Sequence, residues 1–233
     1  RLTDVTGVQT CALPISLEYQ TPSKVRFDSI GKAKDKENLG ERLKTIMAGD
    51  DRASQLVRAL TYQSLAYASE RIPEVSDSPK PIDDAMRWGF GREAGPFEIW
   101  DMLGVEETLK PMVDAGFPAS GWVEEMLSSG HPTFYEYEAG SKKTVYNPSK
   151  KEYELIERPK SMVILSEQKA KGKVVKRNPG ASLVDIGDGV ACVEFHTKMN
   201  ALDQDIFTII QEAQARLKTD FDGLVIGNEA DNF

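Results

Sequence analysis

The spacing of apolar residues changes near residue 133, and this change constrains the fold more than any other feature of the chain. Between residues 50 and 133, apolar side chains recur at helical spacing and are punctuated by proline and glycine. After residue 133, short strand-like runs alternate with turn residues, and one helical stretch precedes the last of them. The pattern predicts an α+β multidomain fragment, in which an all-α helical domain is followed by a truncated α/β domain.

The predicted helical domain, residues 50–133, is expected to contain five helices. The first begins after Asp50 or Asp51, either of which can cap it, and it ends before Pro73. Its predicted apolar face carries Ala53, Leu56, Val57, Leu60, Ser64, Tyr67 and Ala68. The other four helices are expected near residues 80–88, 97–103, 106–115 and 120–129, and glycines close the first three of these.

The first 49 residues are expected to add little to the folded core. Residues 1–16 resemble translated sequencing-adapter sequence, so they and Cys11 are not expected to belong to the fold, and the alternative is a genuine strand. Residues 17–49 are polar, mixed in charge and weakly periodic, which predicts a linker with one short helix from Leu39 to Met47. A further segment, residues 134–180, is predicted to be a hairpin or meander followed by a basic, solvated linker from residue 157.

The last section, residues 181–233, has the pattern of an incomplete α/β domain. Two strands flank the turn Gly187-Asp188-Gly189, which is a strong hairpin signal. A helix and a further strand follow, so a sheet with a crossover helix is expected. The four elements are predicted at residues 182–186, 190–195, 202–217 and 223–227. Because such a half-built sheet leaves an open edge, low stability or aggregation is expected there.

Composition excludes several classes of function. The net charge of -8 and the isoelectric point near 5.0 oppose general nucleic-acid binding, because nothing would offset phosphate repulsion. Two cysteines cannot build a disulfide framework or a four-ligand zinc site, so a reducing, cytoplasmic compartment is expected. With only two histidines, no metal site is expected. No apolar run reaches about 18 residues, so no membrane insertion is expected.

Single residues that could carry chemistry have ordinary structural interpretations. His196 has no obvious catalytic partner and is expected to be a hydrogen-bonding histidine at a strand end. Asp83 and Asp84 are expected to complement the dipole of their own helix rather than to act as general acids. Cys192 is expected in the core. Four aromatic residues that could line an acyl pocket are instead expected to pack between helices: Trp88, Phe90, Phe97 and Trp100.

The most specific segment runs from Ile82 to Asp101, IDDAMRWGFGREAGPFEIWD. Its glycines are spaced Gly-x-Gly-x-x-x-Gly after a predicted helix, whereas a dinucleotide-binding turn follows a strand and has a different spacing. The segment resembles the C-terminal helical domain of 3-hydroxyacyl-CoA dehydrogenases, whose pattern is hydrophobic-Asp-x-Ala-Met-x-x-Gly-x-Gly-x-x-x-Gly-Pro-Phe. The resemblance implies a domain that packs against an NAD-binding domain, supports the acyl-CoA site and mediates dimerisation. It places the catalytic residues in the NAD-binding domain.

A second motif, EFHTKMNAL from Glu194 to Leu202, resembles the first strand and helix start of the crotonase superfamily. In that family, a basic-x-Asn-Ala-Leu turn lies near the phosphates and adenine of CoA. The resemblance makes Lys198, Met199 and Ala201 the candidate CoA contacts, and a lysine ammonium is a good point-charge partner for phosphate. Residues 227–233 resemble the sequence just before the crotonase oxyanion hole, so the hole and the two hydratase glutamates are expected beyond this segment.

Together, the two resemblances imply a fragment of a bifunctional β-oxidation enzyme, with 3-hydroxyacyl-CoA dehydrogenase followed by enoyl-CoA hydratase. NAD is the implied cofactor of the parent enzyme, and an acyl-CoA thioester is its substrate. The fragment itself is expected to lack catalytic residues and to be inactive. Its implied partners are the missing NAD-binding domain, the rest of the crotonase domain and a second copy in a homodimer. The alternative is a non-catalytic helical dimerisation or interaction module.

Overall fold

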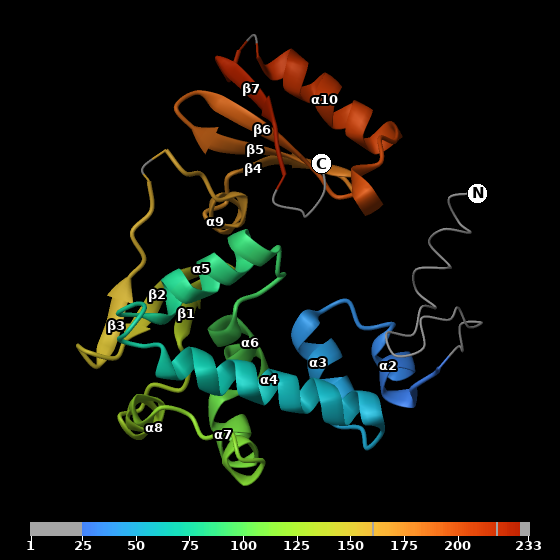
Figure 1. The fold of residues 1–233 in the computed structure, drawn as a ribbon. Helices are drawn as coiled ribbons and strands as arrows, with labels where there is room; N and C mark the ends of the chain where they lie inside the picture. The colour runs from blue at the N-terminus through green and yellow to red at the C-terminus, as the bar shows by residue number, and fades with distance from the viewer. Residues whose placement is uncertain (1–24, 160, 218, 229–233) are drawn as a thin grey trace. The chain divides into compact units, whose positions relative to one another are not determined.

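A computed structural model of the chain describes residues 25–159, 161–217 and 219–228 (Figure 1). The expectations for residues 1–16 and for the end of the closing motif, residues 229–233, lie outside these ranges. The chain divides into two compact units. The first comprises the described residues up to Arg71 together with Ile82–Glu124, and the second comprises Ile72–Pro81 and the chain from Glu125 onward.

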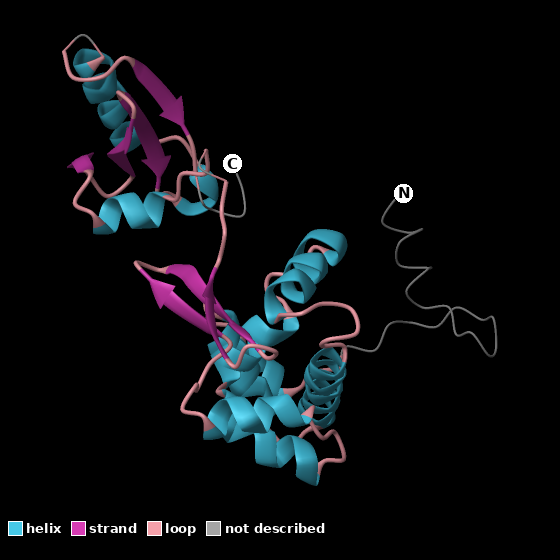
Figure 2. Ribbon diagram, turned by 90° about the vertical axis from the view of Figure 1, so that its left-hand side faces the viewer, coloured by secondary structure: helices cyan, strands magenta, loops and turns pink. Residues whose placement is uncertain are grey.

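The first unit is helical (Figure 2). Two of its helices begin at side-chain caps, because Asn38 accepts a hydrogen bond from the Glu41 amide at 3.2 Å and Asp51 accepts one from the Ser54 amide at 2.9 Å. Gly104, with φ of 95°, ends a later helix. The helices are α2 (Asp28–Ala33), α3 (Leu39–Met47), α4 (Arg52–Glu70), α5 (Pro79–Phe90), α6 (Pro96–Leu103), α7 (Val105–Asp114) and α8 (Gly121–Ser128). The first residues of α5 and the last residues of α8 belong to the second unit.

The region that was predicted to be a linker, residues 17–49, contains two helices in its described part. α3 has the bounds expected for the one short helix, whereas α2 was not expected. The carboxylate of Asp51 holds α2 by accepting hydrogen bonds from the Ser29 amide at 3.0 Å and the Ser29 hydroxyl at 2.9 Å. The linker description is therefore wrong there. A six-residue helix such as α2 is too short to show an apolar stripe in the sequence.

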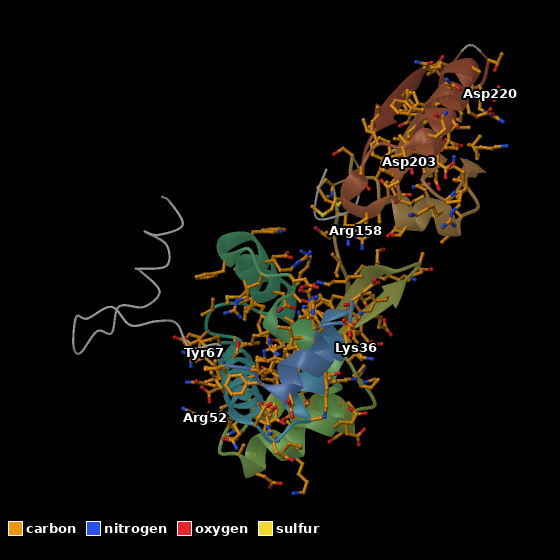
Figure 3. The ribbon with its side chains drawn as sticks, turned by 90° about the vertical axis from the view of Figure 1, so that its right-hand side faces the viewer. Lys36, Arg52, Tyr67, Arg158, Asp203 and Asp220 are labelled. Atoms are coloured by element: carbon orange, nitrogen blue, oxygen red, sulfur yellow. The ribbon has the colours of Figure 1, made fainter. Side chains whose placement is uncertain are left out.

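The packed face of α4 differs from the predicted one. Ala53 and Ala68 are buried, but Leu56, Leu60 and Tyr67 are 59%, 56% and 61% exposed, and Figure 3 labels Tyr67 on this helix. The helix instead buries several small or hydroxyl side chains together with Tyr62 and Leu65: Ala53, Ser54, Ala66, Ala68 and Ser69. The face predicted from hydrophobic spacing is therefore not the packed face. Small side chains let neighbouring segments approach α4 closely, and hydrophobic spacing does not detect them.

The core of the first unit is built around α6. Phe97 and Trp100 are fully buried, as expected, and the indole N–H of Trp100 donates to the Thr108 hydroxyl at 2.7 Å. The expectation that Trp88 and Phe90 pack between helices is wrong, since they are 78% and 75% exposed. Both lie on the last turn of α5, where all of residues 87–90 are exposed.

A three-stranded antiparallel sheet opens the second unit, in the region where a hairpin or meander was expected. Its strands β1 (Tyr135–Glu138), β2 (Ser141–Asn147) and β3 (Glu152–Leu155) are neighbours in that order. Tyr135 lies opposite Val145 and Tyr146 lies opposite Tyr153, so the two tyrosines point to different faces of the sheet, and each is 1% exposed. The ring of His131 lies 5.1 Å from the ring of Tyr146, so the segment before β1 packs on this sheet.

The second sheet has four strands among the described residues: β4 (Val174–Arg177), β5 (Ala181–Gly187), β6 (Val190–Phe195) and β7 (Gly223–Ile226). They are neighbours in the order β4-β5-β6-β7. The antiparallel β5–β6 hairpin places Ser182 opposite Glu194. β7 is parallel to β6, and the helix α10 (Gln204–Arg216) forms the crossover between them. This is the strand, strand, helix, strand arrangement that the sequence predicted.

Each face of the second sheet carries a helix. On one face, Leu183 and Val193 pack against Ile206 and Ile209 of α10. The other face carries Cys192, 3% exposed as expected, and it meets α9 (Leu165–Ala170) through an ion pair between Lys169 and Glu194 at 2.7 Å. α9 and β4 lie inside the predicted basic linker, so that description is wrong for these residues. None of the helices within the described ranges is both long and apolar enough to cross a membrane.

Candidate functional site

The three predicted CoA contacts lie on one turn between β6 and α10, which we call the Lys198 turn (residues 197–201). Met199 and Asn200 both have positive φ, 56° and 51°, a conformation that residues with a Cβ rarely adopt. Within the turn, the Asn200 amide donates to the Thr197 carbonyl at 3.0 Å, and the Thr197 hydroxyl donates to the Ala201 carbonyl at 2.8 Å. Asparagine adopts this conformation more readily than other residues with a Cβ, but Met199 needs support from the surrounding structure, and such strain is concentrated at binding and catalytic sites.

The Lys198 turn presents its predicted contact residues to solvent. Lys198, Met199 and Ala201 are all exposed. Lys198 forms no ion pair with any residue in the described part of the chain, so its ammonium is available to an anion. The neighbouring N-terminus of α10 cannot take that anion, because Asp203 already accepts a hydrogen bond from the Ile206 amide at 3.0 Å. Figure 3 labels Asp203 at this helix start.

A polar network lies behind the Lys198 turn, on the face of the sheet opposite α10. His196 Nε2 and Ser182 Oγ are 2.7 Å apart, and Glu194 accepts two hydrogen bonds from Lys169 at 2.7 and 3.0 Å. Burial lowers the pKa of His196, although the Glu194 carboxylate opposes this shift. His196 is therefore a hydrogen-bonding histidine at a strand end, as expected.

The same network does not have the geometry of a nucleophilic triad. Ser182 is 1% exposed, so its hydroxyl is closed to a substrate. Glu194 approaches His196 Nε2, at 3.9 Å, which is the ring nitrogen that already meets Ser182. A triad needs an accessible hydroxyl and a carboxylate on the other ring nitrogen.

The motif that resembles the dehydrogenase domain builds a helix cap. The carboxylate of Asp83 accepts hydrogen bonds from the amides of Phe97 at 2.9 Å and Glu98 at 3.1 Å, at the start of α6. Gly95 precedes α6, and a Cβ at this position would lie 2.4 Å from Asp83 Cβ. Gly95, at the N-cap position of α6, has no side chain that could accept these hydrogen bonds, so Asp83 caps α6 in its place. We expected it to serve its own helix, but α5 begins at Pro79, so Asp83 lies beyond the first turn.

This cap also decides whether the segment fits NAD. A dinucleotide phosphate binds free amides at a helix N-terminus that follows a glycine-rich turn and a strand. Here the amides of Phe97 and Glu98 are bonded to Asp83, and a helix precedes the glycines. This segment therefore does not fit the phosphates of NAD.

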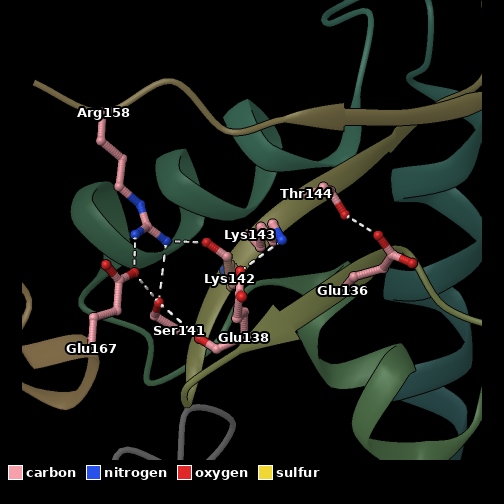
Figure 4. Close-up of polar contacts among 8 residues, drawn as sticks. All are labelled: Glu136, Glu138, Ser141, Lys142, Lys143, Thr144, Arg158 and Glu167. Atoms are coloured by element: carbon pink, nitrogen blue, oxygen red, sulfur yellow. Dashed lines mark hydrogen bonds and ion pairs between the residues drawn. The ribbon is translucent and has the colours of Figure 1, made fainter. Parts of the chain in front are cut away.

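A charged cluster surrounds Arg158, at the start of the segment between β3 and α9 (Figure 4). Arg158 donates to Glu167 at 2.5 Å, to the Ser141 hydroxyl at 3.5 Å and to the Lys142 carbonyl. Hydrogen bonds from Ser141 and then Arg158 lower the pKa of Glu167. The sequence predicted only a solvated linker here, and the partners of Arg158 are too far away in the sequence to signal the cluster.

A cavity of about 590 Å³ adjoins the Arg158 cluster. Leu155 and Ile156 line it together with Lys143, Arg158 and Glu167. The charged groups are paired, Lys143 with Glu138 at 2.7 Å and Arg158 with Glu167. Paired charges of this kind hold segments together but leave no group tuned as a general acid or base. Within the described residues, no group of three or more His, Cys, Asp or Glu side chains could hold a metal ion.

Comparison with known proteins shows that this chain is similar to segments of longer proteins. Over 220 residues, or 94% of the chain, it is 37% identical to a Bacillus subtilis (strain 168) protein with the provisional name 3-hydroxyacyl-CoA dehydrogenase. Over 196 residues, or 82% of the chain, it is 24% identical to a Rickettsia felis (strain ATCC VR-1525 / URRWXCal2) protein with the provisional name fatty acid oxidation complex trifunctional enzyme. No family model and no solved structure matches the chain.

The chain spans 28% and 23% of the lengths of these two relatives. The match to the Bacillus subtilis protein covers 220 of the 233 residues, so it includes both compact units. The names of the relatives agree with the dehydrogenase resemblance and with fatty acid oxidation. Neither name mentions a hydratase.

Proposed function

We propose that the chain is part of a fatty-acid β-oxidation enzyme in which an NAD-dependent 3-hydroxyacyl-CoA dehydrogenase is fused to an enoyl-CoA hydratase. The observation that carries this proposal is the 37% identity to the Bacillus subtilis protein, which extends over 94% of the chain. The Asp83 and Gly95 motif supports the dehydrogenase half. The order β6, Lys198 turn, α10 and parallel β7 supports the hydratase half.

In this proposal, the helical unit is a scaffold of the dehydrogenase half and the Lys198 turn contacts CoA. The ammonium of Lys198 binds a CoA phosphate, and Met199 and Ala201 lie against the same end of the molecule. NAD accepts the hydride of the 3-hydroxyacyl-CoA, and its site belongs to another part of the complete enzyme. The 233-residue chain supplies neither the hydration nor the oxidation by itself. A reducing, cytoplasmic compartment suits the thiol of Cys192.

The test is an assay of the complete gene product that contains this sequence. Given crotonyl-CoA and NAD, it should form NADH, because hydration produces the 3-hydroxyacyl-CoA that the dehydrogenase oxidises. Replacing Lys198 by Ala should raise KM for crotonyl-CoA about threefold to tenfold at unchanged kcat, since one phosphate contact is lost. Lys198→Arg is the matched control, because it keeps the charge. A complete protein that forms no NADH would contradict the proposal.

The second candidate function is a non-catalytic dimerisation module, and one observation favours it. Trp88 and Phe90 are 78% and 75% exposed at the end of α5, and large exposed aromatic side chains are frequent in protein interfaces. If the helical unit forms a homodimer through these two residues, the sedimentation coefficient of the wild-type chain should be that of a dimer. The coefficient of Trp88→Ser should be that of a monomer. Phe207→Ser is the control, because Phe207 is 47% exposed but belongs to the second unit. A wild-type chain that stays monomeric at all concentrations would exclude this module.

A further inference from the structure

The shape of the Lys198 turn depends on support from the segments beside it, because the turn contains two successive residues with positive φ. Met199 and Asn200 are both in the left-handed region, which Met199 rarely adopts, and one of the hydrogen bonds that close the turn is long, with the Ala201 amide 3.3 Å from the Lys198 carbonyl. A flexible turn would carry Lys198 through many positions, which would weaken any contact with a phosphate. The segments that lie against the two ends of the turn therefore decide where its ammonium points.

The chain that enters the turn is held by the segment just before β5. The His196 amide donates to the Gly180 carbonyl at 2.8 Å, and the His196 ring meets the Ser182 hydroxyl at 2.7 Å. Both contacts join the end of β6 to β5 and its preceding loop. The entry side of the turn is thus anchored through backbone and side chain.

The chain that leaves the turn is held by the same segment. The Asn178 side-chain amide donates to the Asp205 carbonyl in the first turn of α10 at 2.8 Å. Its oxygen accepts hydrogen bonds from the amides of Gly180 at 3.1 Å and Ala181 at 2.8 Å, which fixes the loop that carries it. Gly180 is buried, and a Cβ there would lie 2.6 Å from Asp205 Cβ and 2.9 Å from an Asp203 carboxylate oxygen.

We propose that residues 178–180, which we call the clamp, position the Lys198 turn for CoA, with Asn178 and Gly180 as positioning residues that do not touch the ligand. The clamp holds both ends of the turn at once, by Gly180 on the entry side and by Asn178 on the exit side. This inference rests on the proposed function, because it assumes that the Lys198 turn contacts CoA. It adds the residues that make the contact possible.

The experiment is a titration of the 233-residue chain with millimolar CoA, followed by the NMR shifts of the amides of residues 197–201, at low and high salt. Asn178→Ala removes both sets of hydrogen bonds, whereas Asn178→Asp keeps the two acceptor contacts and replaces the donor to the Asp205 carbonyl by a carboxylate oxygen, which repels that carbonyl. Gly180→Ala pushes against the start of α10. Lys173→Ala is the control, because it breaks an exposed ion pair with Asp185 at 2.9 Å in the same sheet.

We expect both Asn178 variants and Gly180→Ala to weaken CoA binding about threefold to tenfold, because a displaced Lys198 loses its contact with the phosphate, which contributes about as much as one hydrogen bond. The affinity of wild type should fall with salt, because the Lys198 contact is exposed. In the clamp variants, this salt dependence should shrink toward that of Lys198→Ala. Lys173→Ala should behave as wild type.

The outcomes separate the two proposals. If Lys198→Ala weakens binding but the Asn178 variants bind as wild type does, the clamp is wrong and the proposed function stands. If the variants lower thermal stability and affinity but keep the full salt dependence, their role is only structural and the clamp is also wrong. If CoA shifts no amide of the turn in wild type, the proposed function of the turn fails and the clamp fails with it.

Discussion

Two aspartates determine where helices of the first unit begin, and both act across a distance in the sequence. Asp51 caps α4 and also binds Ser29, which lies 22 residues earlier. Asp83 caps α6 from α5, 14 residues before Phe97. In both cases one carboxylate satisfies amides that a helix leaves without partners, and it ties two helices together in doing so.

Asp83 lies so close to Gly95 that any side chain at residue 95 would overlap it. Gly95→Ala should lower the free energy of unfolding by about 1–3 kcal/mol, because the new Cβ overlaps Asp83. Gly89→Ala, in α5, is the matched control. Nothing lies within 4 Å of a Cβ there, so it should leave stability unchanged or raise it by up to about 0.5–1 kcal/mol. Urea denaturation measures both, and equal effects would contradict the proposed geometry.

The cap of α4 predicts a dependence of stability on pH. Amide hydrogen bonds from Ser54 and then Ser29 lower the pKa of Asp51 to about 2, below the value of about 3.9 expected in the unfolded chain. Because the folded-state pKa is the lower one, the stability that the carboxylate contributes is present above pH ~4 and is lost as the pH falls toward ~2. The difference in unfolding free energy between wild type and Asp51→Asn should shrink in this window. A difference that stays constant down to pH ~2 would refute the assignment.

At the scale of elements, α4 shows how packing overrides an apolar pattern. Its sequence offers two sets of apolar positions, and the structure buries the set that contains Leu65 while exposing the set that contains Leu56 and Leu60. Ser69, on the packed face, accepts a hydrogen bond from the Ser120 amide at 2.9 Å and donates to the Ala66 carbonyl at 2.7 Å. Buried hydroxyls with partners cost little, so the face with small residues can be the packed one.

Two substitutions on α4 distinguish these faces. Leu65→Ala should lower the free energy of unfolding by about 2–5 kcal/mol, because Leu65 is 1% exposed and its removal leaves a cavity. Leu56→Ala should change it by no more than about 0.5 kcal/mol, since this side chain is 59% exposed. Thermal or urea unfolding of the two variants gives the comparison. The reverse order of effects would mean that the face predicted from hydrophobic spacing is the packed one.

At the scale of the whole molecule, the two units differ in how complete their packing is. The first unit encloses Phe97, Trp100 and Met112 completely. In the second, β7 pairs with β6 on one side, and its Val225 and Ile226 are 45% and 46% exposed. An exposed apolar strand with one neighbour among the described residues is a site for association or local opening.

Hydrogen exchange tests this difference. Amides of β7 should exchange faster than those of β5, because β5 has a hydrogen-bonded strand on each side and β7 pairs with β6 alone among the described strands. Amides of α6 should exchange most slowly, since its aromatic side chains are buried. Protection of β7 equal to that of β5 would show that the edge is covered in solution, and a concentration series would reveal whether a second copy covers it.

The sequence by itself determined the elements whose signals are local. Capping aspartates, glycines at helix ends and the Gly187 to Gly189 turn placed α3 through α8 and the β5–β6 hairpin close to their observed bounds. The same local signals, with the family resemblances, brought the candidate contacts onto one turn. The bounds of these helices and strands were predicted correctly because the interactions that set them join residues within a few positions of each other. The candidate CoA contacts remain a prediction.

Only the tertiary structure decided the features that depend on distant partners. It revealed α2, α9 and β4 in segments that the sequence described as linkers, selected the packed face of α4, and assigned Asp83 to the helix that follows its own. It also placed Asn178 and Gly180 against both ends of the Lys198 turn. The contacts of Asp83 with Phe97 and of Asn178 with Asp205 join residues that are 14 and 27 positions apart, and no local pattern in the sequence records which segments meet.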